Sequence, residues 1–176
     1  MQADQFEATA LPFLNDLFRT ALRMLRDRDA AEDCVQEAFL QAQKSFHRFE
    51  QGTNCRAWMF TILFHVVHHY RRKWFRLSTV GDDETKLFEN TPARELSATA
   101  ITDDEILAAL DAIPQNYREV VLLTDVEEFS YKEAAEILGV PIGTVMSRLS
   151  RGRTLLRTRL EHLRVPNGFL VEGLSC

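Results

Sequence analysis

Apolar residues recur along the chain at the three-to-four-residue spacing of amphipathic helices. The first run predicts a helix over about residues 6–25. A second helix is predicted to start at Asp29, which with Glu32 resembles a capping box, and to reach about Phe46. One face of this helix is apolar, while another is acidic and polar with a single leucine, Leu40. That second face is either ordinary solvated surface or a docking face for a basic partner.

The third predicted helix, capped by Asn54 or Thr53 and ending near Phe75, changes character halfway. Its first half is apolar nearly all round, so we expect it to be buried. Its second half interleaves aromatic, histidine and basic side chains. This mixture suits single-stranded DNA, because cations hold phosphates while flat rings stack on unpaired bases. For Trp58, core packing is at least as good an explanation, whereas Tyr70 lies among charges and is a better candidate for stacking.

Hydrophobic periodicity lapses over residues 77–101, which are acidic and rich in Thr, Ser, Glu and Ala. We interpret this stretch as a flexible linker. Signals for β-hairpins are missing, and the chain has only 7 Gly and 5 Pro. The expected fold is therefore all-α, with two small helical domains over residues 1–76 and 102–164 and a C-terminal tail over residues 165–176.

The second predicted domain follows the plan of a helix-turn-helix. A capping box over residues 102–105 opens a helix that ends at Pro114, and a further helix follows. Ser130 and Glu133 form another capping box, whose helix stops at Gly139 just before a basic helix. The second helix of such a pair enters the major groove by its N-terminal part, unless the pair serves only for packing. The residues that would lie nearest to DNA are Thr144, Met146, Ser147, Arg148 and Arg151.

The net charge of −5 hides a strong segregation of charge. Five bases and no acid lie between Arg56 and Gly81, whereas nine acids and two bases lie between Asp82 and Asp111. Six arginines and one acid follow over residues 141–164. Because local fields decide where a polyanion docks, two basic blocks around an acidic one are compatible with a DNA-binding protein.

The sequence offers little support for metal, redox or membrane chemistry. The three cysteines, Cys34, Cys55 and Cys176, form no C-x-x-C pair, so we expect them to be reduced, inert thiols. A redox switch at Cys34 or Cys55 is the less favoured alternative. The three histidines of the third helix have no acid or cysteine nearby to complete a ligand set: His65, His68 and His69. No phosphate loop or cofactor fingerprint is present, so we expect neither a metal nor a cofactor. No apolar run is long enough for a membrane span, and we expect a cytoplasmic protein.

Several segments resemble the extracytoplasmic-function (ECF) sigma factors of bacterial RNA polymerase, which belong to the sigma-70 superfamily. The resemblance spans roughly residues 10–162, and the motifs occur in the order of that family. The segments that carry it are residues 33–39, 58–62, 70–73, 113–121 and 141–149.

This resemblance implies a role for each surface. Core polymerase would bind the second helix by the clamp helices of its largest subunit, at Asp33, Gln36, Glu37 and Leu40. The third helix and the loop before it would read and melt the −10 promoter element, through Asn54, Arg56, Trp58, His65, His68, Tyr70, Arg71, Arg72 and Lys73. The helix-turn-helix, near the flap region of polymerase, would read the −35 element through Lys132, Thr144, Met146, Ser147, Arg148, Arg151 and Arg153.

The resemblance thus implies a transcription initiation factor, and not an enzyme, whose partners are core RNA polymerase and promoter DNA. Residues 141–153 are similar to the subgroup that pairs with zinc-binding anti-sigma proteins, so we expect such a partner as well. His65 stands where many members have asparagine, and Met146 stands where a basic residue is common. Both departures affect which bases the protein would read.

Two other functions remain open from the sequence. A stand-alone helix-turn-helix regulator would explain residues 102–164, but not the acidic face of the second helix or the aromatic and basic third helix. A metal-dependent enzyme would use the three histidines. Failure to bind core polymerase would favour the first alternative, and stoichiometric zinc or iron would favour the second.

Overall fold

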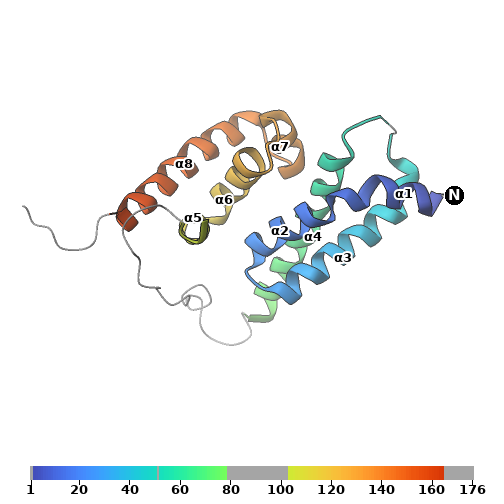
Figure 1. Ribbon diagram of the computed structural model, residues 1–176, viewed down its shortest axis with the longest axis horizontal. Coiled ribbons are helices and arrows are strands. Elements are labelled where there is room, and N and C mark those ends of the chain that lie inside the picture. Colours follow the sequence, from blue (N-terminus) through green and yellow to red (C-terminus); the bar gives the residue numbers. More distant parts are fainter. Residues whose placement is uncertain (1, 51, 79–102, 165–176) are drawn as a thin grey trace, which may run out of the picture.

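The computed structural model describes residues 2–50, 52–78 and 103–164, and the regular structure within these ranges is helical. Figure 1 shows α1 to α4 as one group, with α5 to α8 as a second group beside it. Apart from residues 77 and 78, the predicted linker lies outside the described residues, and so does the predicted tail over residues 165–176. None of the described helices is both long and apolar enough to cross a membrane.

The prediction of one continuous helix over residues 6–25 is wrong. The chain forms α1 (Gln2–Ala10), a 3₁₀ turn (Leu11–Phe13) and then α2 (Leu14–Leu25). Pro12 lies within the turn and has no backbone N–H, so an uninterrupted ladder of helical hydrogen bonds cannot pass through it.

The N-terminal cap of α3 (Arg28–Ser45) also differs from the prediction. Asp27 provides the cap, because its side chain accepts a hydrogen bond from the backbone N–H of Ala30 at 2.9 Å. Arg26 ends α2 in the left-handed conformation, with φ 57°, and the chain enters the next helix directly afterwards. The cap therefore falls at Asp27 and not at Asp29, the position that the sequence pattern favoured.

The long helix α4 (Cys55–Ser78) is the central element of the first domain. Its predicted cap is confirmed, since Asn54 Oδ1 accepts a hydrogen bond from the backbone N–H of Ala57 at 3.1 Å. The first half of α4 is largely buried, as expected. The side chains that are at most 1% exposed are Met59, Phe60, Leu63, Phe64 and Val67.

The second domain consists of α5 (Asp103–Asp111), α6 (Gln115–Val121), α7 (Tyr131–Leu138) and α8 (Ile142–Arg164). A wide π-type turn (Leu122–Val126) follows α6. The predicted capping box at the start of α7 is confirmed: the Ser130 backbone N–H donates to Glu133 Oε2 at 2.9 Å, and the Glu133 N–H donates to Ser130 Oγ at 3.2 Å. Gly139 ends α7 in the left-handed conformation.

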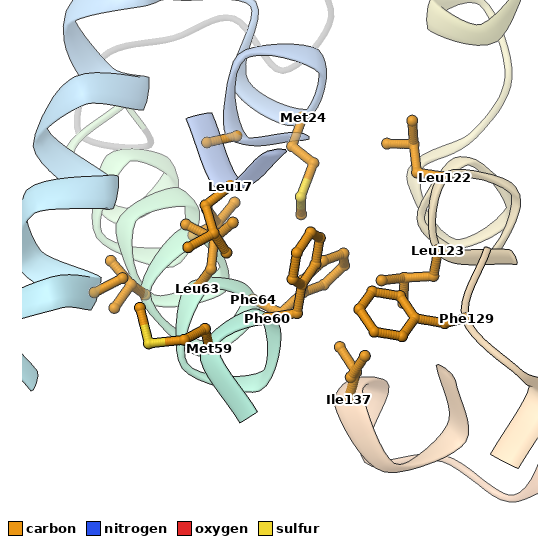
Figure 2. Packing of buried hydrophobic residues seen from close by; sticks show 14 of the residues in the cluster. Leu17, Met24, Met59, Phe60, Leu63, Phe64, Leu122, Leu123, Phe129 and Ile137 are labelled. Carbon is orange, nitrogen blue, oxygen red and sulfur yellow. The ribbon is translucent and has the colours of Figure 1, made fainter. Parts of the chain in front are cut away.

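The two domains pack together through a shared apolar core. Phe60 of α4 meets Phe129 of the second domain edge to face, with 4.9 Å between the ring centroids. Figure 2 shows this contact between side chains of α2 and α4 on one side and of the second domain on the other. Besides the two phenylalanines, the labelled residues near the boundary are Met24, Phe64, Leu122, Leu123 and Ile137.

Candidate nucleic-acid and partner interfaces

The four side chains predicted to bind core polymerase lie together on an exposed face of α3. Asp33, Gln36 and Glu37 are exposed, and Leu40 is 50% exposed. Gln41 donates a hydrogen bond to Glu37 Oε1 at 2.8 Å along the same helix. An exposed leucine among carboxylate and amide groups suits a partner helix with both basic and apolar side chains.

A groove between α1 and α3 extends this face. It is lined by Phe6, Glu7, Leu11, Gln36, Phe39, Leu40 and Gln43. Leu11 lies in the 3₁₀ turn and is 49% exposed, so the groove carries an exposed apolar side chain on each side. The sequence did not reveal Leu11 as a candidate, because the expected continuous helix gave no reason to single it out.

The residues predicted to bind the −10 element separate into an exposed group and a partly covered group. His65, Arg72 and Lys73 are exposed on the surface of α4. Arg56 and His68, in contrast, face the second domain and pair with its carboxylates. The structure therefore does not bring the predicted set together on one open surface.

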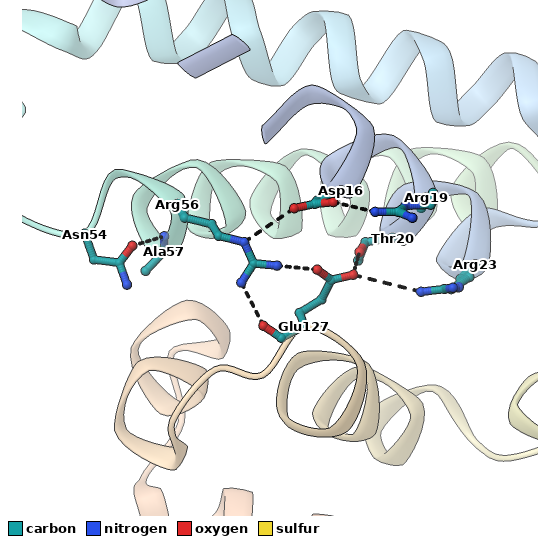
Figure 3. Close-up of polar contacts among 8 residues, drawn as sticks. All are labelled: Asp16, Arg19, Thr20, Arg23, Asn54, Arg56, Ala57 and Glu127. Atoms are coloured by element: carbon teal, nitrogen blue, oxygen red, sulfur yellow. Dashed lines mark hydrogen bonds and ion pairs between the residues drawn. The ribbon is translucent and has the colours of Figure 1, made fainter. Parts of the chain in front are cut away.

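Arg56 contacts the second domain through Glu127 and Phe129. Its guanidinium donates to the backbone carbonyl of Glu127 at 2.7 Å and to Glu127 Oε2 at 2.5 Å (Figure 3). Asp16 of α2 lies 3.6 Å from the same guanidinium. The guanidinium carbon also lies over the Phe129 ring, 4.5 Å from its centroid. In this arrangement Arg56 is not free to bind a phosphate.

Glu127 is the acidic centre of this contact. It is only 7% exposed, and Thr20 Oγ1 donates a hydrogen bond to its Oε1 at 2.9 Å. Arg23 lies 3.9 Å from the same oxygen. A buried carboxylate needs such partners, because an unpaired buried charge costs several kcal/mol.

Two further carboxylates of the second domain contact predicted DNA-binding residues. Nε2 of His68 lies 2.9 Å from Oε1 of Glu119, a residue that is 5% exposed. Asn54 Nδ2 donates to Glu133 Oε1 at 2.5 Å, while its Oδ1 caps α4. Glu133 thus serves the predicted capping box and the domain contact at once, and hydrogen bonds from Ser130 lower the pKa of its carboxyl group.

Arg71 is tied to the first domain by a hydrogen bond to the Met24 carbonyl at 3.1 Å. Burial lowers the pKa of its guanidinium, while the nearby carboxylate of Glu119 acts in the opposite direction. Arg71 is therefore also only partly accessible.

The two aromatic residues of the predicted −10 set are partly buried. Trp58 packs against Phe49, with 4.9 Å between ring centroids, and against Phe46 at 6.3 Å. Tyr70 is half-buried, and burial raises the pKa of its phenol, helped by the charge of Asp27. Trp58 therefore has a packing role in this structure.

The predicted −35 residues are largely accessible. Met146 is 51% exposed, and the other exposed or half-exposed members are Lys132, Thr144, Ser147, Arg148, Arg151 and Arg153. Arg153 forms a two-fold ion pair with Asp125 of the π-type turn, at 2.6 and 3.0 Å. The hydrogen bonds from this pair raise the pKa of the Arg153 guanidinium. In this structure Arg153 tethers α8 to the turn, while Thr144 to Arg151 form the accessible N-terminal part of α8.

The histidines and buried cysteines show no sign of a shared site. Within the described ranges, no cluster of three His, Cys, Asp or Glu side chains could hold a metal ion. Cys34 and Cys55 are buried free thiols. Burial, with Asp33 nearby, raises the pKa of the Cys34 thiol to about 11, which disfavours the reactive thiolate.

Comparisons with known proteins agree with this architecture. A family model described as Sigma-70 region 2 matches residues 11–76, and one described as Sigma-70, region 4 matches residues 103–156. The chain is 33% identical over 141 residues to the ECF RNA polymerase sigma factor EcfG of Rhodopseudomonas palustris, covering 80% of this chain and 76% of that protein. The chain belongs to the ECF sigma factors of the sigma-70 family.

Further relatives support this membership. The ECF RNA polymerase sigma factor SigM of Bacillus subtilis is 31% identical over 147 residues, with 82% of this chain and 88% of that protein covered. Among solved structures, the sigma factor RpoE in complex with the anti-sigma factor NepR from Bartonella quintana has a TM-score of 0.75 at 32% identity. That match covers 89% of this chain and 97% of the other.

As an ECF sigma factor, this chain is a transcription initiation factor that directs RNA polymerase to promoters. Membership of the sigma factor family excludes the hypothesis of a stand-alone helix-turn-helix regulator, because a sigma factor acts through polymerase. It offers no support for the metal-dependent enzyme. Besides Leu11, sequence analysis missed two carboxylates of the second domain, Glu119 and Glu127, since nothing in the local pattern indicates that they meet α4.

Proposed function

We propose that the sigma factor binds core polymerase by the exposed acidic face of α3, and that α4 and α8 read the −10 and −35 elements. One observation supports this proposal above all. The face of α3 around Leu40 and the N-terminal part of α8 are both accessible, although they belong to different domains. The groove that contains Leu11 enlarges the polymerase contact. The clamp helices and the flap region are the proposed contact points on polymerase.

The two domains would act as a bivalent reader. Each small domain offers few base contacts, so each binds promoter DNA weakly alone. When polymerase holds both, binding of the second domain becomes intramolecular, and its effective concentration rises. In this proposal the chain performs no covalent chemistry of its own and works in the cytoplasm, where polymerase is found.

An anti-sigma protein is a proposed further partner. The related RpoE was solved in complex with the anti-sigma factor NepR, which supports a partner of this general class. The similarity of residues 141–153 to factors with zinc-binding partners stays a prediction. Purifying the tagged sigma factor with its native partner, and measuring zinc in the complex, tests it.

The decisive test of the proposed function is transcription in vitro from a pool of random promoters, with the purified chain, core polymerase and sequencing of the transcripts. Start sites downstream of a shared two-part motif would support the −10 and −35 assignments. If a folded chain with active core polymerase produced no transcripts, a core-binding assay would separate loss of docking from an unsuitable promoter pool.

A further inference from the structure

Two apolar side chains are exposed at the N-terminal part of α8, the helix assigned to the −35 element. Met146 is 51% exposed and Ile142 is 47% exposed, and no other large apolar side chain in the described part of the second domain is as exposed as either. They are four residues apart, so both lie on the same flank of the helix. A helical side chain leans toward the preceding turn, which brings Met146 over the turn that carries Ile142. The two side chains thus offer one apolar surface to a binding partner.

Packing of α8 within its own domain does not explain these two residues. The buried side of the helix is formed by Val145, which is fully buried, and by Leu149, which is 2% exposed. Gly152 continues this side close to α6, since a Cβ at its position would lie 2.9 Å from a side chain of that helix. The orientation of α8 is therefore fixed by other residues, while Met146 and Ile142 remain turned outward.

The polar side chains of the same part of α8 lie on the opposite flank. Thr144, Arg148 and Arg151 follow the spacing i, i+4, i+7 and so share one side of the helix. With 3.6 residues per turn, this side lies across the buried face from Met146. Two turns beyond Met146, Arg153 is held by a carboxylate of the π-type turn through hydrogen bonds of 2.6 and 3.0 Å. The N-terminal end of the Met146 flank therefore presents apolar atoms to DNA.

The base edges in the major groove of B-DNA carry one apolar group, the C5 methyl of thymine, among hydrogen-bond donors and acceptors. The thioether chain of methionine is flexible and polarisable, so it fits closely against an irregular apolar surface. Methionine has no donor and is only a weak acceptor, and it cannot form the paired hydrogen bonds by which arginine binds guanine or glutamine binds adenine. A methionine that enters the major groove therefore favours thymine.

We propose that Met146, with Ile142 beside it, contacts the C5 methyl group of a thymine in the −35 element. The inference rests on the proposed assignment of α8 to that element, and it deepens the assignment by naming one base. From the opposite flank, Arg148 would read a different base pair of the same element. Removal of a single methyl group from the DNA is then expected to weaken binding, although every hydrogen bond of the base pair remains.

The test removes the methyl group from the DNA and the apolar surface from the protein, separately and together. The −35 sequence comes from the transcription experiment, and synthetic promoter duplexes carry deoxyuridine in place of each of its thymines in turn, on either strand. A second set carries 5-bromodeoxyuridine, whose bromine is similar in size to the methyl group. The proteins are the full-length wild type and Met146→Gln, which keeps the length of the side chain but makes it polar. Competition binding by each protein assembled with core polymerase measures the affinities, and circular dichroism verifies the fold.

We expect deoxyuridine at one position to weaken binding of the wild type about three- to fivefold, the effect of burying one methyl group, and bromodeoxyuridine to restore it. Met146→Gln should bind the thymine and deoxyuridine duplexes equally at that position, so a double-mutant cycle gives a coupling there. The matched control is Leu155→Gln, the same change at a residue of α8 that is 36% exposed and lies beyond its N-terminal part. This control should keep the full sensitivity to deoxyuridine.

Equal affinity of the wild type for thymine and deoxyuridine at every position would overturn the inference, and so would a −35 element without an A·T pair. A loss that persists unchanged in Met146→Gln would do the same, because the methyl group would then act on another residue or on the shape of the DNA. The transcription experiment decides the proposed function separately. A shared two-part motif supports that function even if deoxyuridine has no effect, so failure of the inference and failure of the proposed function give different results.

Discussion

At the scale of single residues, side chains of the same type differ in accessibility because their surroundings differ. Arg56 and Arg148 are both arginines on helices assigned to DNA contact. Arg56 binds Glu127 and lies over Phe129, whereas Arg148 is half-exposed and forms no ion pair within the described residues. Arg148 is thus the better single test of base recognition.

Arg148→Ala is expected to weaken discrimination at one position of the −35 element by about 1–3 kcal/mol, if Arg148 contacts a base edge. Competition binding of the polymerase complex to −35 variants measures this, with Arg157→Ala, an exposed arginine further along α8, as the control. A loss of equal size for every sequence would identify Arg148 as a phosphate contact instead.

Cys34 is expected to resist alkylation in the folded protein. Its thiol pKa is raised to about 11 by burial, so at pH 8 roughly one molecule in a thousand carries the thiolate. Raising the pH toward 11 should therefore accelerate the reaction. Mass spectrometry after iodoacetamide treatment of the native and the urea-unfolded chain checks this. Rapid native labelling at pH 8 would return Cys34 to the candidates for a redox switch.

At the scale of elements, the caps show what local sequence can predict. Asn54 at α4 and Ser130 with Glu133 at α7 were predicted correctly, because a cap needs only partners about three residues apart. The cap at Asp27 was missed because it depends on how α2 ends, in the left-handed conformation of Arg26. The break at Pro12 was missed because apolar periodicity continued on both sides of it.

Gly152→Ala is expected to destabilise the protein by about 1–3 kcal/mol, although alanine favours helices. A Cβ at this position of α8 would lie 2.9 Å from Val121 Cγ2 and 3.3 Å from the Tyr117 carbonyl oxygen of α6. Urea unfolding followed by circular dichroism measures the change. The control is Gly143→Ala in the same helix.

A Cβ at Gly143 meets no atom within 4 Å, so this control should change the free energy of unfolding by no more than about 1 kcal/mol. Equal effects of the two substitutions would mean that close packing of α8 on α6 is not what requires glycine at position 152.

At the scale of the whole molecule, the domain contact joins groups far apart in the sequence. Thr20 and Glu127 are 107 residues apart, and Arg56 and Glu127 are 71 apart. Arg26 also reaches Asp111, 3.2 Å away at the end of α5. Each of these pairs joins the two domains. The pairs form only because the shared apolar core holds the domains together, and no local sequence motif predicts them.

Glu37→Lys is expected to weaken core-polymerase binding by about 2 kcal/mol or more while leaving the fold intact, since it reverses an exposed charge on the proposed docking face. Fluorescence competition for core polymerase measures the affinity, and circular dichroism verifies the fold. Glu161→Lys, an exposed reversal on α8, is the control. If Glu37→Lys bound core polymerase as tightly as the wild type, the proposal that this face of α3 binds polymerase would be wrong.

The sequence by itself determined the helical class, most helix positions, two of the caps and the family, because these depend on short-range periodicity and on motifs that lie within single helices. Only the tertiary structure decided that Arg56, His68 and Asn54 meet the carboxylates of the second domain, and that Trp58 packs against Phe49. The physical reason is that the accessibility of a charged or aromatic side chain depends on which distant surface covers it, and no local pattern encodes that surface.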